Sequence, residues 1–96
     1  MKPDFKAQLT FIAGSNETSR SPVASGYRAA IHFSFSQDVL VGIFSFLETE
    51  LVFPGDTAQA EITLPDAGNA KLYEGMDFDF FENSILVGQG VVTKMY

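Results

Sequence analysis

The sequence contains no cysteine and no tryptophan, and its 96 residues include only six lysines and arginines. The absence of cysteine excludes a disulfide framework, a thiolate nucleophile and a thiolate metal site, and it suits a reducing cytosol. No apolar run is long enough for a membrane-spanning helix, and residues 1–6 lack the apolar run of a signal peptide. We therefore expect a cytoplasmic protein without a membrane segment.

The shortage of cations bears on the partners of the chain. Twelve Asp and Glu residues give a formal net charge of −6 at pH 7, whereas a phosphate backbone is bound mainly by clustered Lys and Arg side chains. The six cations are scattered along the sequence; they are Lys2, Lys6, Arg20, Arg28, Lys71 and Lys94. The charge balance therefore disfavours tRNA and other nucleic acids as partners.

The sequence is rich in apolar residues, with a hydrophobic fraction of 46% and ten phenylalanines. This content excludes a disordered chain and suffices for one small domain spanning residues 1–96. Apolar and polar residues alternate with a period of two, which is typical of strands, and no segment has a sustained helical pattern. The strands are expected at residues 5–11, 27–36, 39–46, 57–64, 76–81 and 84–94, with a tight hairpin turn at Glu82–Asn83.

Six short strands separated by polar turns predict an all-β fold, a six-stranded closed antiparallel β-barrel. Closure would protect the edges of such apolar strands from pairing between molecules. The strand at residues 39–46 is unusual because it is apolar on both faces around Gly42. We expect it to be covered on both sides or to lie at a sharp bend.

Four short motifs follow one another in a defined order. They are residues 5–9 (FKAQL), the pair Arg20-Ser21-Pro22 and Gly26-Tyr27-Arg28, the turn Pro54-Gly55-Asp56, and a last hairpin with Gly75, Phe78 and residues 87–92 (VGQGVV). In this order and spacing the chain resembles the C-terminal (domain III) β-barrel family of translation elongation factor Tu, as a stand-alone domain. The resemblance covers almost the whole chain and implies the same barrel.

The departures from that family concern function. In the family, the domain helps to hold aminoacyl-tRNA through polar and basic side chains. Three positions where the family has arginine are here Asp77, Phe81 and Ile85, so the local charge falls by about four units. This loss argues against inherited tRNA binding. The remaining cations Arg20, Arg28 and Lys94 support an alternative hypothesis, a translation accessory that contacts tRNA or the ribosome.

The sequence offers little chemistry. His32 shares a strand face with Ser34 and Ser36, and Asp38 follows, but this spacing arises in any alternating strand and does not specify a catalytic triad. Asp77 and Asp79 share a face and are oxygen ligands, yet the spacing of a calcium loop is missing. We therefore predict neither an enzyme nor a metal site.

Nucleotide binding is also not expected. The segment Gly88-Gln89-Gly90 lacks the third glycine and the βαβ context of a dinucleotide site, and no Gly-Lys-Ser/Thr motif for phosphate is present, so we expect no GTP binding and no cofactor. The best hypothesis is a non-catalytic module for protein–protein interaction. Its predicted interface lies around Asp77, Asp79, Phe81 and Ile85 and binds a protein partner or a second copy of the chain.

Overall fold

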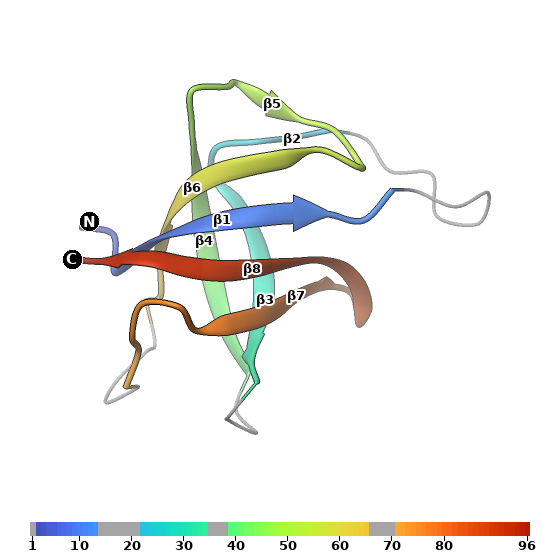
Figure 1. Cartoon of the computed structure of the whole chain (residues 1–96). Helices are drawn as coiled ribbons and strands as arrows, with labels where there is room; N and C mark the ends of the chain where they lie inside the picture. Colours follow the sequence, from blue (N-terminus) through green and yellow to red (C-terminus); the bar gives the residue numbers. More distant parts are fainter. Residues whose placement is uncertain (1, 14–21, 35–38, 66–70) are drawn as a thin grey trace.

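The computed structural model describes residues 2–13, 22–34, 39–65 and 71–96. All regular structure in these ranges is β-strand (Figure 1). The strands are β1 (Phe5–Phe11), β2 (Val23–Ala24), β3 (Tyr27–Phe33), β4 (Val39–Leu47), β5 (Leu51–Val52), β6 (Thr57–Thr63), β7 (Asp77–Glu82) and β8 (Ile85–Met95). Within the same ranges there is no helix that could cross a membrane.

The six longer strands form a closed barrel in the order β1-β6-β4-β3-β7-β8, and β8 returns to pair with β1. Every neighbouring pair is antiparallel. The structure therefore confirms the predicted all-β, six-stranded closed antiparallel barrel. The two chain ends lie side by side at one end of the barrel, where the Tyr96 amide donates to the Asp4 carbonyl (Figure 1).

The hairpin turn and the number of strands differ from the prediction. The hairpin turn lies at Asn83–Ser84 rather than Glu82–Asn83, and these residues have φ angles of 51° and 66°. Two consecutive positive φ angles are typical of a type I′ turn. Such turns usually have glycine at the second position, so the serine at position 84 does not indicate one. The second error is the omission of β2 and β5, which form a separate two-stranded sheet. Each has only two residues, too few for a periodic pattern.

Phenylalanine fills the barrel. Phe5, Phe33, Phe44, Phe78 and Phe80 are almost completely buried, and their rings meet mainly at angles between 45° and 75°. For example, the Phe44 and Phe80 centroids are 5.2 Å apart, and those of Phe5 and Phe78 are 5.8 Å apart. The Phe5–Phe78 pair is edge-to-face and the Phe44–Phe80 pair is tilted; aromatic pairs contribute roughly 0.5–1.5 kcal/mol beyond burial. The alternation predicted for the inner faces is thus the source of the core.

Two glycines of β8 make room for these rings. Gly88 and Gly90 are the cross-strand partners of Phe80 and Phe78 on β7. A Cβ atom at Gly90 would lie 2.3 Å from the Phe78 Cζ atom, and one at Gly88 would lie 2.5 Å from the Phe80 Cζ atom. The Gly-Gln-Gly segment therefore serves ring packing.

The outer face of β4 differs from the expectation. Phe44 and Phe46 are buried, whereas Val39 is 58% and Val41 47% exposed. Of the two predicted alternatives, covering on both sides is therefore wrong, because Val39 and Val41 on the outer face are exposed; the alternative of a sharp bend stays a prediction. Isolated exposed valines are common on protein surfaces and need no functional explanation.

Candidate functional site

The predicted interface was centred on β7, and three of its four residues share the outer face of that strand. Asp77, Asp79 and Phe81 alternate with the buried Phe78 and Phe80. Asp77 is exposed, whereas Asp79 and Phe81 are half-buried. Both carboxylates therefore lie on the side of β7 that faces away from the barrel core.

The fourth residue, Ile85, lies elsewhere. A register shift between Phe80 and Phe81 makes Phe81 the partner of Leu86 and Glu82 the partner of Ile85. Cross-strand partners share a face and neighbours along a strand alternate, so Phe81 and Ile85 lie on opposite faces of the hairpin. They do not form one patch. The register shift that separates them could not be predicted from the sequence pattern.

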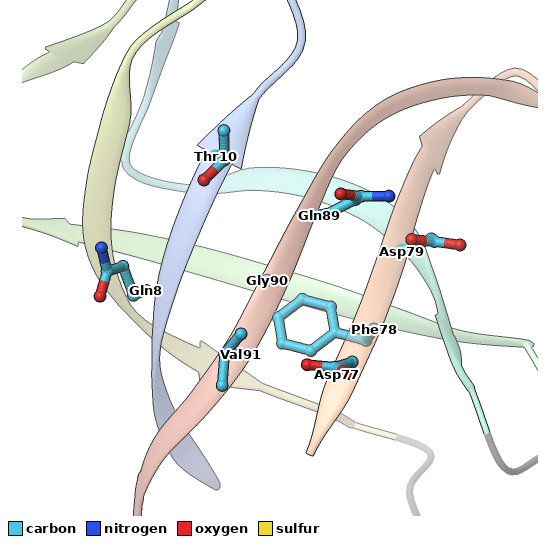
Figure 2. A pocket seen from close by; sticks show the side chains of 8 residues that line it. All are labelled: Gln8, Thr10, Asp77, Phe78, Asp79, Gln89, Gly90 and Val91. Atoms are coloured by element: carbon cyan, nitrogen blue, oxygen red, sulfur yellow. The ribbon is translucent and has the colours of Figure 1, made fainter. Parts of the chain in front are cut away.

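A shallow hollow of about 590 Å³ adjoins the two carboxylates. Figure 2 shows its walls: Gln8 and Thr10 on β1, Gln89 and Val91 on β8, and Asp77 and Asp79 on β7. The Gln89 side chain points toward Asp79, and the Phe78 ring lies beneath Gly90 (Figure 2). The lining contains amides, a hydroxyl and carboxylates but no histidine, lysine or arginine, so it offers no base paired with a nucleophile.

His32 also gives no catalytic grouping. It is the cross-strand partner of Asp79 on β7 and of Val39 on β4. Ser34 is exposed and its hydroxyl contacts the Asp77 carbonyl at 3.5 Å, while Ser36 and Asp38 lie outside the described residues. Within the described ranges, no group of three or more His, Cys, Asp or Glu side chains could hold a metal ion.

The residual cations do not gather. Arg28 is on β3 opposite Ile43, whereas Lys94 is near the end of β8 opposite Lys6. These positions are at opposite ends of the barrel, because β3 begins beside the Asn83–Ser84 turn and Lys94 lies beside the chain termini. Arg20 lies outside the described residues.

Lys94 belongs to a small polar cluster at the chain termini. Its ammonium lies 5.7 Å from the centroid of the Tyr96 ring, and the Tyr96 hydroxyl donates a 2.8 Å hydrogen bond to Glu61. This hydrogen bond is the main reason that the pKa of Tyr96 is raised above its usual value of 10.0, with smaller contributions from desolvation and the Glu61 charge. The cluster ties the last residues of the chain to β6.

Four exposed apolar side chains lie on three segments, and two of these segments are joined to the end of β1 by main-chain hydrogen bonds. Ile12 is 43%, Leu51 45%, Phe53 50% and Ile85 45% exposed. We call these four residues the barrel-end patch. Only Ile85 among them was predicted as an interface residue. The sequence signal that was overlooked is a run of three apolar residues, 51–53. It lies directly before the Pro-Gly-Asp turn, where polar residues are more common.

Main-chain hydrogen bonds bring the segments of the patch together. The Ile12 amide donates to the Val87 carbonyl, two residues from Ile85, at 2.9 Å. On its other side, the Phe11 carbonyl accepts from the Gly55 amide at 3.1 Å, two residues from Phe53. The end of β1 is thus joined to both neighbouring turns, which lie on the same side of the molecule in Figure 1.

The Pro54–Gly55 turn projects Phe53 into solvent. Proline fixes its own φ, Gly55 has a φ of 89°, and the Asp56 amide donates to the Phe53 carbonyl at 3.0 Å. These features are those of a type II turn. The Asp56 carboxylate also accepts a 3.0 Å bond from the Phe53 amide. Phe53 is therefore held at an ordered turn although half of its side chain is exposed.

Acidic groups border the barrel-end patch. Glu50 precedes Leu51, Asp56 closes the turn after Phe53, and Glu82 is the cross-strand partner of Ile85. The Tyr27 hydroxyl donates a 2.9 Å hydrogen bond to Glu82 and so fixes its position. The patch is a group of exposed apolar side chains with polar and acidic neighbours, a composition typical of a protein-binding surface.

The fold and this surface define a small closed antiparallel β-barrel with an exposed apolar end and no catalytic grouping among its described residues. No protein-family model matches the chain. The resemblance to domain III of elongation factor Tu therefore stays a prediction, beyond the barrel architecture that the structure shows.

Proposed function

We propose that the chain is a non-catalytic protein-interaction module, and that it binds a protein partner through the barrel-end patch. The observation that carries this proposal is the grouping of four large apolar side chains, each 43–50% exposed, on segments joined by main-chain hydrogen bonds. Burying the exposed half of one such side chain contributes about 1 kcal/mol to binding. Four of them supply the apolar centre of a small interface.

The patch modifies the interface expected from the sequence. Ile85 stays part of the interface, whereas Asp77, Asp79 and Phe81 on the outer face of β7 are not among the four residues of the patch. The resemblance to a translation-factor domain supports a cytoplasmic, translation-related setting for the partner. Direct contact with tRNA is less well supported, because Arg28 and Lys94 are at opposite ends of the barrel.

Site-specific photo-cross-linking in the native host tests the proposal. A benzoylphenylalanine in place of Phe53 should give a discrete cross-linked product, because the ring lies where a partner would dock. The same group in place of Gln59, an exposed residue on β6, serves as the control. Ile85→Lys should remove the product from position 53. Equal products from both positions, or none from position 53, would refute the proposal.

A further inference from the structure

The outer surface of the barrel carries a second hollow beside the one that adjoins β7. The first hollow has a volume of about 590 Å³ and the second about 310 Å³, and Gln8 lines both. The second hollow lies over β6 and the end of β4, where Thr57, Gln59 and Glu48 line it. We call the two hollows together the outer groove. The residues that line it include none of the barrel-end patch.

The strand register arranges the lining of the groove in two parallel rows. One row holds Asp79, Gln89 and Thr10, and the other holds Asp77, Val91 and Gln8 (Figure 2). Strand β6 continues both rows, because Thr57 is the partner of Thr10 and Gln59 is the partner of Gln8. Neighbouring strands lie about 4.8 Å apart, so each row across four strands is about 14 Å long, and the rows are about 7 Å apart. The groove therefore suits an elongated ligand.

The side chains of the two rows form a mixed set of hydrogen-bonding groups. Each glutamine presents a carbonyl acceptor and two N–H donors in one plane, each threonine hydroxyl can donate and accept, and each carboxylate accepts. A ligand hydroxyl also donates and accepts. Amides and carboxylates side by side thus complement hydroxyl groups on neighbouring carbon atoms.

The same lining disfavours other classes of ligand. Its described residues include no lysine, arginine or histidine, so its carboxylates would repel phosphates, nucleic acids and acidic sugars. Val91 is the one apolar side chain of the two rows, which is too little for a lipid or an apolar peptide. In the ranges that the structure describes, no group of three or more His, Cys, Asp or Glu side chains could hold a metal ion.

From this geometry we propose that the outer groove binds a neutral oligosaccharide. Neighbouring sugar hydroxyls pair with the glutamine amides and the carboxylates, and Val91, which is 40% exposed, contacts the C–H face of a ring. Gln8 binds in both hollows. The strand face of another small barrel, the OB-fold, also binds oligosaccharides. The inference goes beyond the proposed function, because it concerns a different surface and does not rest on the barrel-end patch.

The probes are cellotetraose, maltotetraose and xylotetraose, each titrated into the isotope-labelled protein at millimolar concentration. We expect at least one of them to shift the side-chain amide signals of Gln8 and Gln89 and to leave the signals of Ile12 and Phe53 unchanged. The corresponding monosaccharide should bind at least tenfold more weakly, because it fills only one of the two hollows.

A substitution in the shared wall tests the geometry. Gln8→Leu keeps the size of an exposed side chain but removes its amide, and it should weaken binding of the tetrasaccharide at least fivefold. Ser45→Leu is the matched control, since it places leucine at an exposed position of β4 that does not line the groove. It should leave the affinity unchanged, and the main-chain amide spectra of both variants should show the intact barrel.

A double variant separates a sugar from an organic cation such as spermidine. Asp77→Asn with Asp79→Asn removes both charges but keeps an acceptor oxygen at each position. We expect it to bind the tetrasaccharide within threefold of the wild type. Tighter binding of spermidine than of any tetrasaccharide, lost in the double variant, would replace the sugar by a cation and overturn the inference.

Other results would also contradict a sugar site in the groove. They are no shift from any of the three tetrasaccharides, equal binding of the monosaccharide and the tetrasaccharide, or equal loss in the Gln8 and Ser45 variants. Shifts at Ile12 and Phe53 that Ile85→Lys removes would move the ligand to the barrel-end patch. The cross-link at position 53 reports on the patch alone, so the failure of one proposal is distinguishable from the failure of the other.

Discussion

Replacing Gly88 or Gly90 on β8 by alanine adds one methyl group to the inner side of the barrel. The two substitutions should differ in their effect on stability, because the added groups meet different atoms. A Cβ atom at Gly90 would lie 2.3 Å and 2.7 Å from two Phe78 ring atoms and 2.9 Å from Leu9 Cδ2, all of them side-chain atoms. At Gly88 it would lie 2.5 Å from Phe80 Cζ and 2.5 Å from the main-chain oxygen of Thr10. Only the first clash can be relieved by moving side chains.

The magnitudes follow from two opposing effects. Replacing glycine by alanine at a compatible conformation stabilises a protein by about 0.4–1 kcal/mol through the unfolded chain, whereas overpacking a core costs about 1–3 kcal/mol. We expect Gly90→Ala to lower the free energy of unfolding by about 1–2 kcal/mol. Gly88→Ala should cost about 3 kcal/mol, because the Thr10 carbonyl can move only if the β1–β8 pairing opens.

Urea denaturation of a double-mutant cycle provides the test. Phe78→Leu should offset part of the Gly90→Ala loss, with a favourable coupling of about 1 kcal/mol. Phe80→Leu should offset less of the Gly88→Ala loss, because the contact with the Thr10 oxygen persists. The reasoning fails if Gly88→Ala is as stable as the wild type, or if Phe80→Leu restores it fully.

Three further predictions concern single groups. Ser84→Gly should stabilise the protein by about 0.5–1 kcal/mol, measured by thermal unfolding, because glycine adopts the positive φ of the hairpin turn without strain; destabilisation would contradict the turn geometry. Tyr27→Phe should cost about 1 kcal/mol in urea denaturation by removing the hydrogen bond to Glu82, and an unchanged midpoint would show that this bond is unimportant. Tyr96 should form its phenolate only above its usual pKa of 10.0. Because the pKa of Tyr96 is raised in the folded state, the associated stability is present at neutral pH and is lost as the pH rises through the folded-state pKa. Glu61→Gln should lower the midpoint of the Tyr96 titration followed by ultraviolet absorbance, and no change would exclude Glu61 as the cause.

The barrel was predictable because its signal is local and repeated. Each inner face is a run of apolar residues two apart, such as Phe5, Ala7, Leu9 and Phe11, all of which are buried. A one-residue shift would move the whole set to the solvent side, so the pattern fixes the facing of each strand. Six such strands then favour a closed barrel.

The candidate site was less predictable because it depends on nonlocal geometry. The shared face of Asp77 and Asp79 follows from alternation alone and was predicted. The separation of Phe81 from Ile85 depends on a register shift that no residue type announces. The proximity of Ile12 to the Pro54–Gly55 turn depends on main-chain bonds between segments more than 40 residues apart in the sequence.

The two exposed apolar surfaces differ in what surrounds them, and this difference decides between them. On β4, Val39 and Val41 are beta-branched residues on a regular strand, and an exposed valine there is explained by strand propensity. At the barrel end, Phe53 and Ile12 lie outside regular strands, where propensity offers no reason for large apolar side chains. Exposure of apolar side chains at ordered positions without such a reason supports the proposed binding surface. The barrel-end patch is therefore the surface at which substitutions should affect association while leaving the free energy of unfolding nearly unchanged.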